Sequence, residues 1–143
     1  MKYRTLRKYK YQNLADHYYI SPYKFDLGEG VDRIKNDHCC ILATGLIIVK
    51  KHYAWNGANC FPDYDWIMVP SMVHDVICQL TAEGTIPFKN RYIGDKIIRD
   101  MCRNRLADGM KFLADMVYQG VRIGTFVNRY KKPRPEDKIY TVG

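Results

Sequence analysis

The sequence of 143 residues predicts an α+β fold, in which an N-terminal β-hairpin region packs on about three helices. Three observations support this class. Segments rich in β-branched and aromatic residues come first, a turn-rich loop covers 56–66, and apolar residues then recur at helical spacing. We therefore expect a single domain over 1–143, with a β-rich region and loop at 1–66, a helical region at 67–128 and a basic extended tail at 129–143.

The strand predictions rest on residue alternation and on turn residues. The segment KYKYQN at 8–13 alternates tyrosine with polar positions, and ILATGLIIVKKHYAW at 41–55 is rich in β-branched and aromatic side chains. Glycines at Gly28, Gly30 and Gly45 favour turns between these segments. We expect one or two hairpins in this part of the chain.

Three helices are predicted from the spacing of apolar residues. The first begins at about Ile67 or Pro70 and ends at Leu80, with Pro70 suited to a first turn. The second covers about 91–106 and the third about 110–126. The core positions expected in the third helix are Phe112, Leu113, Met116, Val117 and Val121.

Composition limits the class of protein. The formal net charge is +8, and basic residues gather near both ends of the sequence. Such ends suit nucleic acid, anionic lipid or an acidic partner protein, although a solvated basic surface is the simpler interpretation. The longest nearly apolar run, at 39–49, is shorter than the roughly 20 residues that a spanning helix needs. We expect no signal peptide and no transmembrane segment.

The five cysteines are an odd number and form no Cys-x-x-Cys pair. Neither a zinc knuckle nor a dense disulfide framework is expected from such a set. Free thiols in a reducing compartment are the default interpretation.

The candidate site centres on VPSMVHDVICQL at 69–80, where His74 and Asp75 interrupt an amphipathic helix. Asp95 follows His74 by 21 residues and shares a helix face with Ile98 and Cys102, so it should point toward packed surface. A short connection makes the two helices antiparallel neighbours, which allows Asp95 to meet His74. A histidine held by a buried carboxylate is an oriented general base.

Asp75 lies about 100° around the helix from His74 and is free to hold something else. A hard cation such as calcium takes carboxylate oxygens together with loop carbonyls, which residues 57–59 offer. These parts together suggest activation of water beside a cation, the chemistry of ester hydrolysis. The alternative is a structural His74–Asp95 pair, with Asp75 as a surface acid.

This arrangement resembles the secreted phospholipase A2 superfamily, in which a calcium loop precedes a His-Asp helix and an aspartate on an antiparallel helix orients the histidine. The resemblance implies that His74 is the general base, Asp95 its partner and Asp75 a calcium ligand. It also implies that carbonyls around Gly57 and Asn59 complete the metal site and an oxyanion site.

A second resemblance covers about residues 40–125. The segments HYAWNGANC, VPSMVHDVICQL, IGDKIIRDMC and VYQGVRIGT resemble, in order, four motifs of an uncharacterised family found mostly in bacteriophages and prophages. The resemblance implies a phage origin, with the protein in the host cytoplasm or the virion, and a small α+β fold. It adds Trp55 and Asn56 as loop candidates; Asn56 stands where the family usually has aspartate, and Asn59 where it has serine.

Three functions remain open from the sequence. The first is a hydrolase of a lipid or other ester, with or without a dependence on calcium. The second is a virion protein of the head, tail or connector that uses the fold as a scaffold. The third is a host-takeover protein that binds an acidic partner or nucleic acid.

Overall fold

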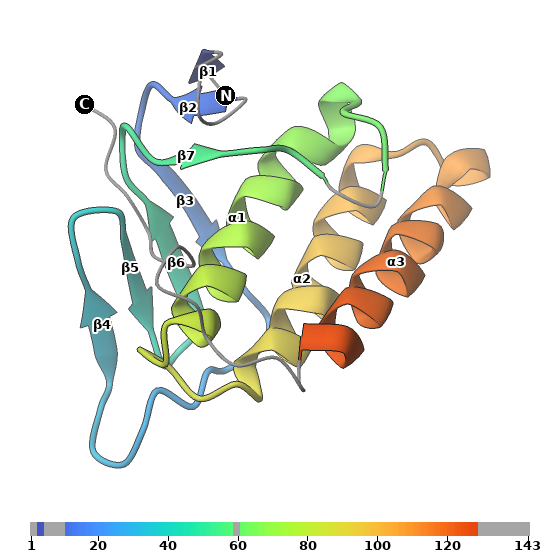
Figure 1. The fold of residues 1–143 in the computed structure, drawn as a ribbon. Helices are drawn as coiled ribbons and strands as arrows, with labels where there is room; N and C mark the ends of the chain where they lie inside the picture. The colour runs from blue at the N-terminus through green and yellow to red at the C-terminus, as the bar shows by residue number, and fades with distance from the viewer. Residues whose placement is uncertain (1–2, 5–10, 59–60, 129–143) are drawn as a thin grey trace.

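The computed structural model describes residues 3–4, 11–58 and 61–128. The N-terminal strands form two antiparallel sheets that pack with three helices, and α2 lies between α1 and α3 (Figure 1). The helices are α1 Asp65–Ala82, α2 Asn90–Arg105 and α3 Phe112–Asn128, with a 3-10 turn at Asp108–Met110. The strands are β1 Tyr3–Arg4, β2 Tyr11–Asn13, β3 His17–Ile20, β4 Arg33–Lys35, β5 Cys39–Leu42, β6 Leu46–Val49 and β7 Ala54–Trp55. The predicted α+β class is confirmed.

The larger sheet has the strand order β3-β6-β5-β4, and the smaller one has the order β1-β2-β7. Strands β5 and β6 form a hairpin in which Ile41 lies opposite Ile47. Side chains alternate between buried and half-buried positions along both strands, because successive residues of a strand point to opposite faces. One face of the sheet is therefore available to cover a helix.

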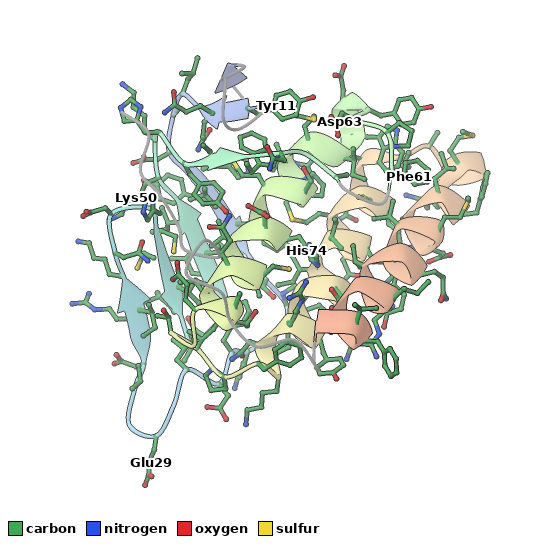
Figure 2. The ribbon with its side chains drawn as sticks, in the orientation of Figure 1. Tyr11, Glu29, Lys50, Phe61, Asp63 and His74 are labelled. Atoms are coloured by element: carbon green, nitrogen blue, oxygen red, sulfur yellow. The ribbon has the colours of Figure 1, made fainter. Side chains whose placement is uncertain are left out.

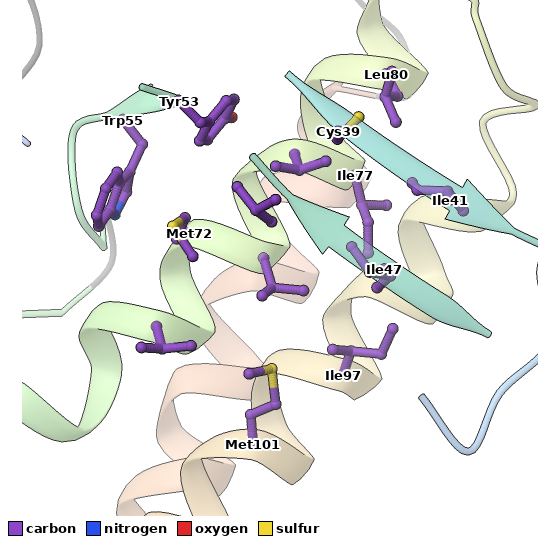
Figure 3. Packing of buried hydrophobic residues seen from close by; sticks show 14 of the residues in the cluster. Cys39, Ile41, Ile47, Tyr53, Trp55, Met72, Ile77, Leu80, Ile97 and Met101 are labelled. Atoms are coloured by element: carbon purple, nitrogen blue, oxygen red, sulfur yellow. The ribbon is translucent and has the colours of Figure 1, made fainter. Parts of the chain in front are cut away.

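The main core lies between that sheet face and α1. Figure 3 shows Ile41 and Ile47 of the sheet directed toward Ile77 of α1, with Ile97 of α2 close by. Helix α2 approaches α1 closely at Gly94, where a Cβ atom would lie 3.0 Å from the Ile77 Cγ2 atom. This close approach sets the position of Asp95, the next residue of α2.

The β5–β6 turn depends on the glycine at position 45. Gly45 has a φ of +118°, and a Cβ atom there would lie 2.6 Å from the Tyr23 carbonyl oxygen and 2.7 Å from that of Ser21. Its carbonyl also accepts a hydrogen bond from the Ser21 N–H at 2.9 Å. The turn thus holds the segment after β3 in place.

We expect Gly45→Ala to lower the free energy of unfolding by about 3 kcal/mol, because it adds both backbone strain and a clash with two carbonyl oxygens. Gly30→Ala is the matched control: Gly30 has a φ of +71°, but a Cβ atom there meets no atom within 4 Å. Gly30→Ala should lower the free energy of unfolding by only about 1 kcal/mol, because the positive φ is its one source of strain. Urea denaturation of both variants measures the difference, and equal losses would contradict the role of the Gly45 contact.

Helix α1 begins earlier than the sequence suggests. It starts at Asp65, whose carboxylate suits a first helical turn, so Pro70 lies inside the helix rather than at its start. Proline lacks the N–H that would bond to the carbonyl four residues earlier, but its fixed φ is compatible with a helix. Among the described residues, no helix is long and apolar enough to span a membrane.

Helix α3 buries a different face from the one expected. Its buried residues are Ala114, Val117, Val121 and Thr125, whereas Phe112 and Met116 are exposed. Val117 and Val121 were predicted correctly, but the placement of Phe112 and Met116 in the core was wrong. Two apolar stripes run along this helix, and only one of them can face α2.

Two further predictions concern the cysteines and the tail. The four described cysteines, Cys39, Cys40, Cys78 and Cys102, are free thiols, as expected. Cys60 and the tail at 129–143 lie outside the described residues.

Candidate functional site

The predicted contact between His74 and Asp95 is present. The His74 Nε2 atom lies 2.7 Å from the Asp95 Oδ1 atom, across the interface of α1 and α2. The Asp95 side chain is fully buried, and the His74 side chain is 14% exposed. Figure 2 places His74 on the side of α1 that faces the other helices. The carboxylate fixes the orientation of an imidazole that keeps a small part of its surface in contact with solvent.

The second oxygen of Asp95 is held by α3. The Thr125 hydroxyl donates a hydrogen bond of 2.6 Å to Asp95 Oδ2, and an Arg122 guanidinium nitrogen lies 3.7 Å from the same oxygen. All three helices therefore contribute to one polar network. The sequence analysis missed Thr125; the signal was its place in the buried series of 114, 117, 121 and 125.

Cys78, one turn after His74, contacts the imidazole. Its sulfur lies 3.6 Å from Nδ1 and 3.7 Å from Nε2. A sulfur in line with the Nδ1 lone pair would be clearly closer to Nδ1 than to Nε2. Nearly equal distances indicate a sulfur packed over the ring, so the thiol covers His74 and is not aligned to pass its proton to Nδ1.

The surroundings of His74 favour its protonated form. Burial lowers the pKa of His74, but the Cys78 sulfur and the hydrogen bond with Asp95 act in the other direction, and the pKa is raised above its ordinary value. A buried carboxylate at 2.7 Å stabilises the imidazolium directly. At neutral pH most molecules therefore carry the ion pair, and the minority with neutral His74 carry a base stronger than a free imidazole.

Asp75 points away from His74, toward the sheets. Its Oδ2 atom accepts hydrogen bonds from the Tyr53 hydroxyl at 2.5 Å and from the Gln79 amide at 2.9 Å. Burial raises the pKa of Asp75, and the Tyr53 hydrogen bond offsets part of that rise. This carboxylate joins α1 to the segment that leads into β7.

The loop after β7 lies beside the N-terminal end of α1, whereas Asp75 lies just past the middle of that helix. A Cβ atom on Gly57 would lie 2.5 Å from Asp63 Oδ1, and the Ala58 N–H donates to that same oxygen at 3.1 Å. Asp63 precedes α1, whereas Asp75 lies ten residues into it, about 15 Å along the axis. The structure therefore does not bring Asp75 together with Gly57, because the chain after Tyr53 runs toward the helix N-terminus.

The carboxylate that does meet the loop is Asp63, which the sequence analysis did not single out. Its Oδ2 atom accepts a 2.7 Å hydrogen bond from the Tyr11 hydroxyl of β2, and Figure 2 shows the two labelled side chains beside each other. Asp63 thereby ties the loop to the smaller sheet.

The remaining loop candidates take different positions. Trp55 is buried and donates from its indole nitrogen to the Ser71 hydroxyl at 3.1 Å, so it anchors β7 on α1. Asn56 is exposed, and Asn59 lies outside the described residues. Among the described residues, no three His, Cys, Asp or Glu side chains are grouped closely enough to hold a metal ion. The predicted calcium site is thus not assembled from Asp75 and Gly57.

A surface hollow of about 390 Å³ lies elsewhere, between the end of β3 and the last turns of α2. Its lining residues are Tyr19, Ile20, Pro22, Asp100, Arg103 and Asn104. None of the candidate site residues contributes to it, so it is separate from His74 and Asp95.

The fold and the His74 network define a small α+β protein with a three-helix polar site. Comparisons with protein families, curated proteins and solved structures found no match for this chain. The function proposed below therefore rests on the geometry of the site.

Proposed function

We propose that this protein is a phage-encoded hydrolase that cleaves an ester bond in a lipid or another acyl substrate. The observation that supports the proposal is the 2.7 Å contact between His74 Nε2 and Asp95 Oδ1, with the other oxygen of Asp95 held by Thr125. A carboxylate fixed in this way orients the imidazole and stabilises the positive charge that it gains in the reaction.

The roles of the two ring nitrogens follow from this contact. Nε2 carries the hydrogen that is donated to Asp95, so the neutral imidazole has its free lone pair on Nδ1. Nδ1 takes a proton from water as the oxygen of that water attacks the acyl carbon. His74 then returns the proton to the alcohol that leaves, and the acid and alcohol products are released.

A graded series of p-nitrophenyl esters, from acetate to long acyl chains, tests the proposal with the full chain. Saturable hydrolysis that is proportional to protein concentration and absent from a His74→Gln variant supports it. Hydrolysis no faster than the buffer blank across the series, or equal hydrolysis by the variant, contradicts it.

The pH dependence gives an independent prediction. Since His74 must be neutral to accept a proton, and Asp95 and Cys78 raise its pKa, kcat/KM should increase with pH through a midpoint above the ordinary imidazole value of about 6.5. Asp95→Asn removes the negative charge and should move that midpoint down. Blank-corrected pH profiles of kcat/KM measure the midpoints of the wild type and of Asp95→Asn. A wild-type midpoint at or below about 6.5 would contradict the assigned role of Asp95.

A second candidate function is that of a virion structural or assembly protein. It is favoured by the exposed apolar side chains along α3, where Phe112 is 56%, Met116 53% and Ile123 65% exposed. Large apolar side chains gathered on one surface are typical of sites of protein association. Mass spectrometry of purified particles tests this candidate: many copies per particle support it, and absence from the particle contradicts it.

A further inference from the structure

Helix α3 carries two apolar faces, and only one of them is used within the chain. The exposed apolar side chains of α3 are Phe112, Met116, Ile123, Phe126 and Val127. The outer stripe is defined here as the four of them that share one side of the helix, Phe112, Met116, Ile123 and Val127, with Phe126 beside it. Its members are spaced by four, seven and four residues, so they lie on one side of the helix. Figure 1 shows α3 at the edge of the helical layer, with α2 on its inner side.

The spacing of the outer stripe is that of a helix that packs against another helix. With Gln119 between Met116 and Ile123, the positions follow intervals of four, three, four and four, which keep them on one side of an α-helix with 3.6 residues per turn. A helix that only faces solvent has no need for this pattern. The occupant is therefore expected to be a helix.

We propose that the outer stripe pairs with the outer stripe of a second copy of this chain, with the two α3 helices antiparallel. If the helices cross between residues 119 and 120, Met116 of one copy lies opposite Ile123 of the other, and Phe112 lies opposite Val127. Every large apolar member then has an apolar partner. A two-fold axis repeats each contact, as an isologous interface requires.

The charges beside the stripe are complementary in the same arrangement. Asp115 and Arg122 lie on one flank of the stripe, seven residues apart, and their side chains are 58% and 37% exposed. Within the chain, Asp115 lies 3.4 Å from Arg103 and Arg122 lies 3.7 Å from Asp95, so contacts with a second copy would add to these pairs. In the antiparallel pair, Asp115 of each copy approaches Arg122 of the other, which gives two symmetric ion pairs. In a parallel pair, this flank would instead face the opposite flank of the partner helix, which carries Leu113, Gly120 and Gly124 and no charge, so these ion pairs would not form. The charges therefore favour the antiparallel orientation.

The residue at the crossing point is also suited to this pairing. Gly120 interrupts α3 at its middle, where glycine costs about 1 kcal/mol relative to alanine. At the point where two helices cross, the missing side chain lets the backbones approach more closely. Gly120 therefore has a packing role in the dimer.

Sedimentation equilibrium of the full chain over a range of concentrations, at about 0.15 M salt to screen the net charge, tests the proposal. The wild-type protein should form a reversible dimer. Ile123→Asp should raise the dimer dissociation constant at least tenfold, because each dimer would lose two buried isoleucines. The matched control is Ile20→Asp, at an isoleucine of β3 that is 79% exposed, which should leave the constant unchanged.

Two further variants test the orientation and the axis. Asp115→Arg should weaken the dimer, because it places two arginines together at each flank. Gln119→Cys should give a disulfide-linked dimer under mild oxidation in a background where the native cysteines are blocked or replaced, while Ile20→Cys should not. Circular dichroism and unfolding midpoints confirm that each variant is folded.

A wild-type chain that stays monomeric at all concentrations would overturn the proposal and leave the stripe to another occupant, such as the segment at 129–143 or a different protein. A dimer that survives Ile123→Asp with unchanged affinity would overturn it as well, because association would then use another surface.

Discussion

His74→Gln is expected to slow ester hydrolysis by about 10²- to 10⁴-fold, the contribution typical of a positioned general base. Glutamine keeps an N–H donor for Asp95, so the contact that joins α1 to α2 survives in part. The amide has no basic nitrogen and accepts no proton from water. The loss should therefore appear in kcat at a nearly unchanged unfolding midpoint, which separates the chemical role from the structural one.

His38→Gln is the matched control for this substitution. His38 is also mostly buried, but it lies just before β5, where its ring packs against Tyr53, and not on the helices that carry Asp95 and Thr125. Its kcat should stay close to that of the wild type. If His74→Gln and His38→Gln reduce the rate equally, the effect comes from a general loss of packing and the catalytic role of His74 is refuted.

Asp95→Ala is expected to cost about 3 kcal/mol of folding free energy. Asp95 is fully buried and bonds to His74 of α1 and Thr125 of α3, so its removal leaves two buried partners without an acceptor. The cost stays near the lower end of the range for a broken buried pair, because His74 can release its proton. Urea denaturation at about pH 6 measures the loss.

The exposed carboxylate at Asp115 provides the control. Asp115 also lies near an arginine, Arg103 at 3.4 Å, but both side chains are about half exposed. In the monomer, Asp115→Ala should therefore change stability by about 0.5 kcal/mol or less. Equal losses at Asp95 and Asp115 would mean that the buried network contributes no more than a surface ion pair.

The stabilising effect of the His74–Asp95 pair also depends on pH in a defined direction. The folded state raises the pKa of His74, so the pair contributes fully below the unfolded value of about 6.5. The contribution is lost as the pH increases through the raised folded value. The stability difference between wild type and Asp95→Ala should therefore narrow at alkaline pH.

The sequence predicted the fold class and the helix order because periodicity reports which side of an element is apolar. It failed on α3, where Phe112 and Met116 belong to an apolar face that lies outside the core. Both faces of this helix have helical spacing, and nothing in one chain marks which of them meets α2. The face with Ala114 and Thr125 packs against α2, because these two side chains are small enough for close packing; both are fully buried.

Part of the candidate site, the contact between His74 and Asp95, was predictable from the sequence. The separation of His74 and Asp95 and the short link between their helices were sufficient to place the two side chains together. The metal site could not be predicted in this way, because its prediction needed the path of the chain between residues 53 and 63. That path carries Gly57 to Asp63 at the start of α1, while Tyr53 takes the Asp75 carboxylate.

The hydrogen bond from Thr125 to Asp95 links the site to the order in which the chain is made. Thr125 belongs to the last described helix, and its contact with α2 forms only after that helix has emerged from the ribosome and docked. Until then, Asp95 lacks the contacts of its second oxygen with Thr125 and Arg122, so the carboxylate that orients His74 is held less firmly. A nascent or truncated chain without α3 is thus expected to lack the proposed hydrolase activity, which would begin only when translation has passed α3.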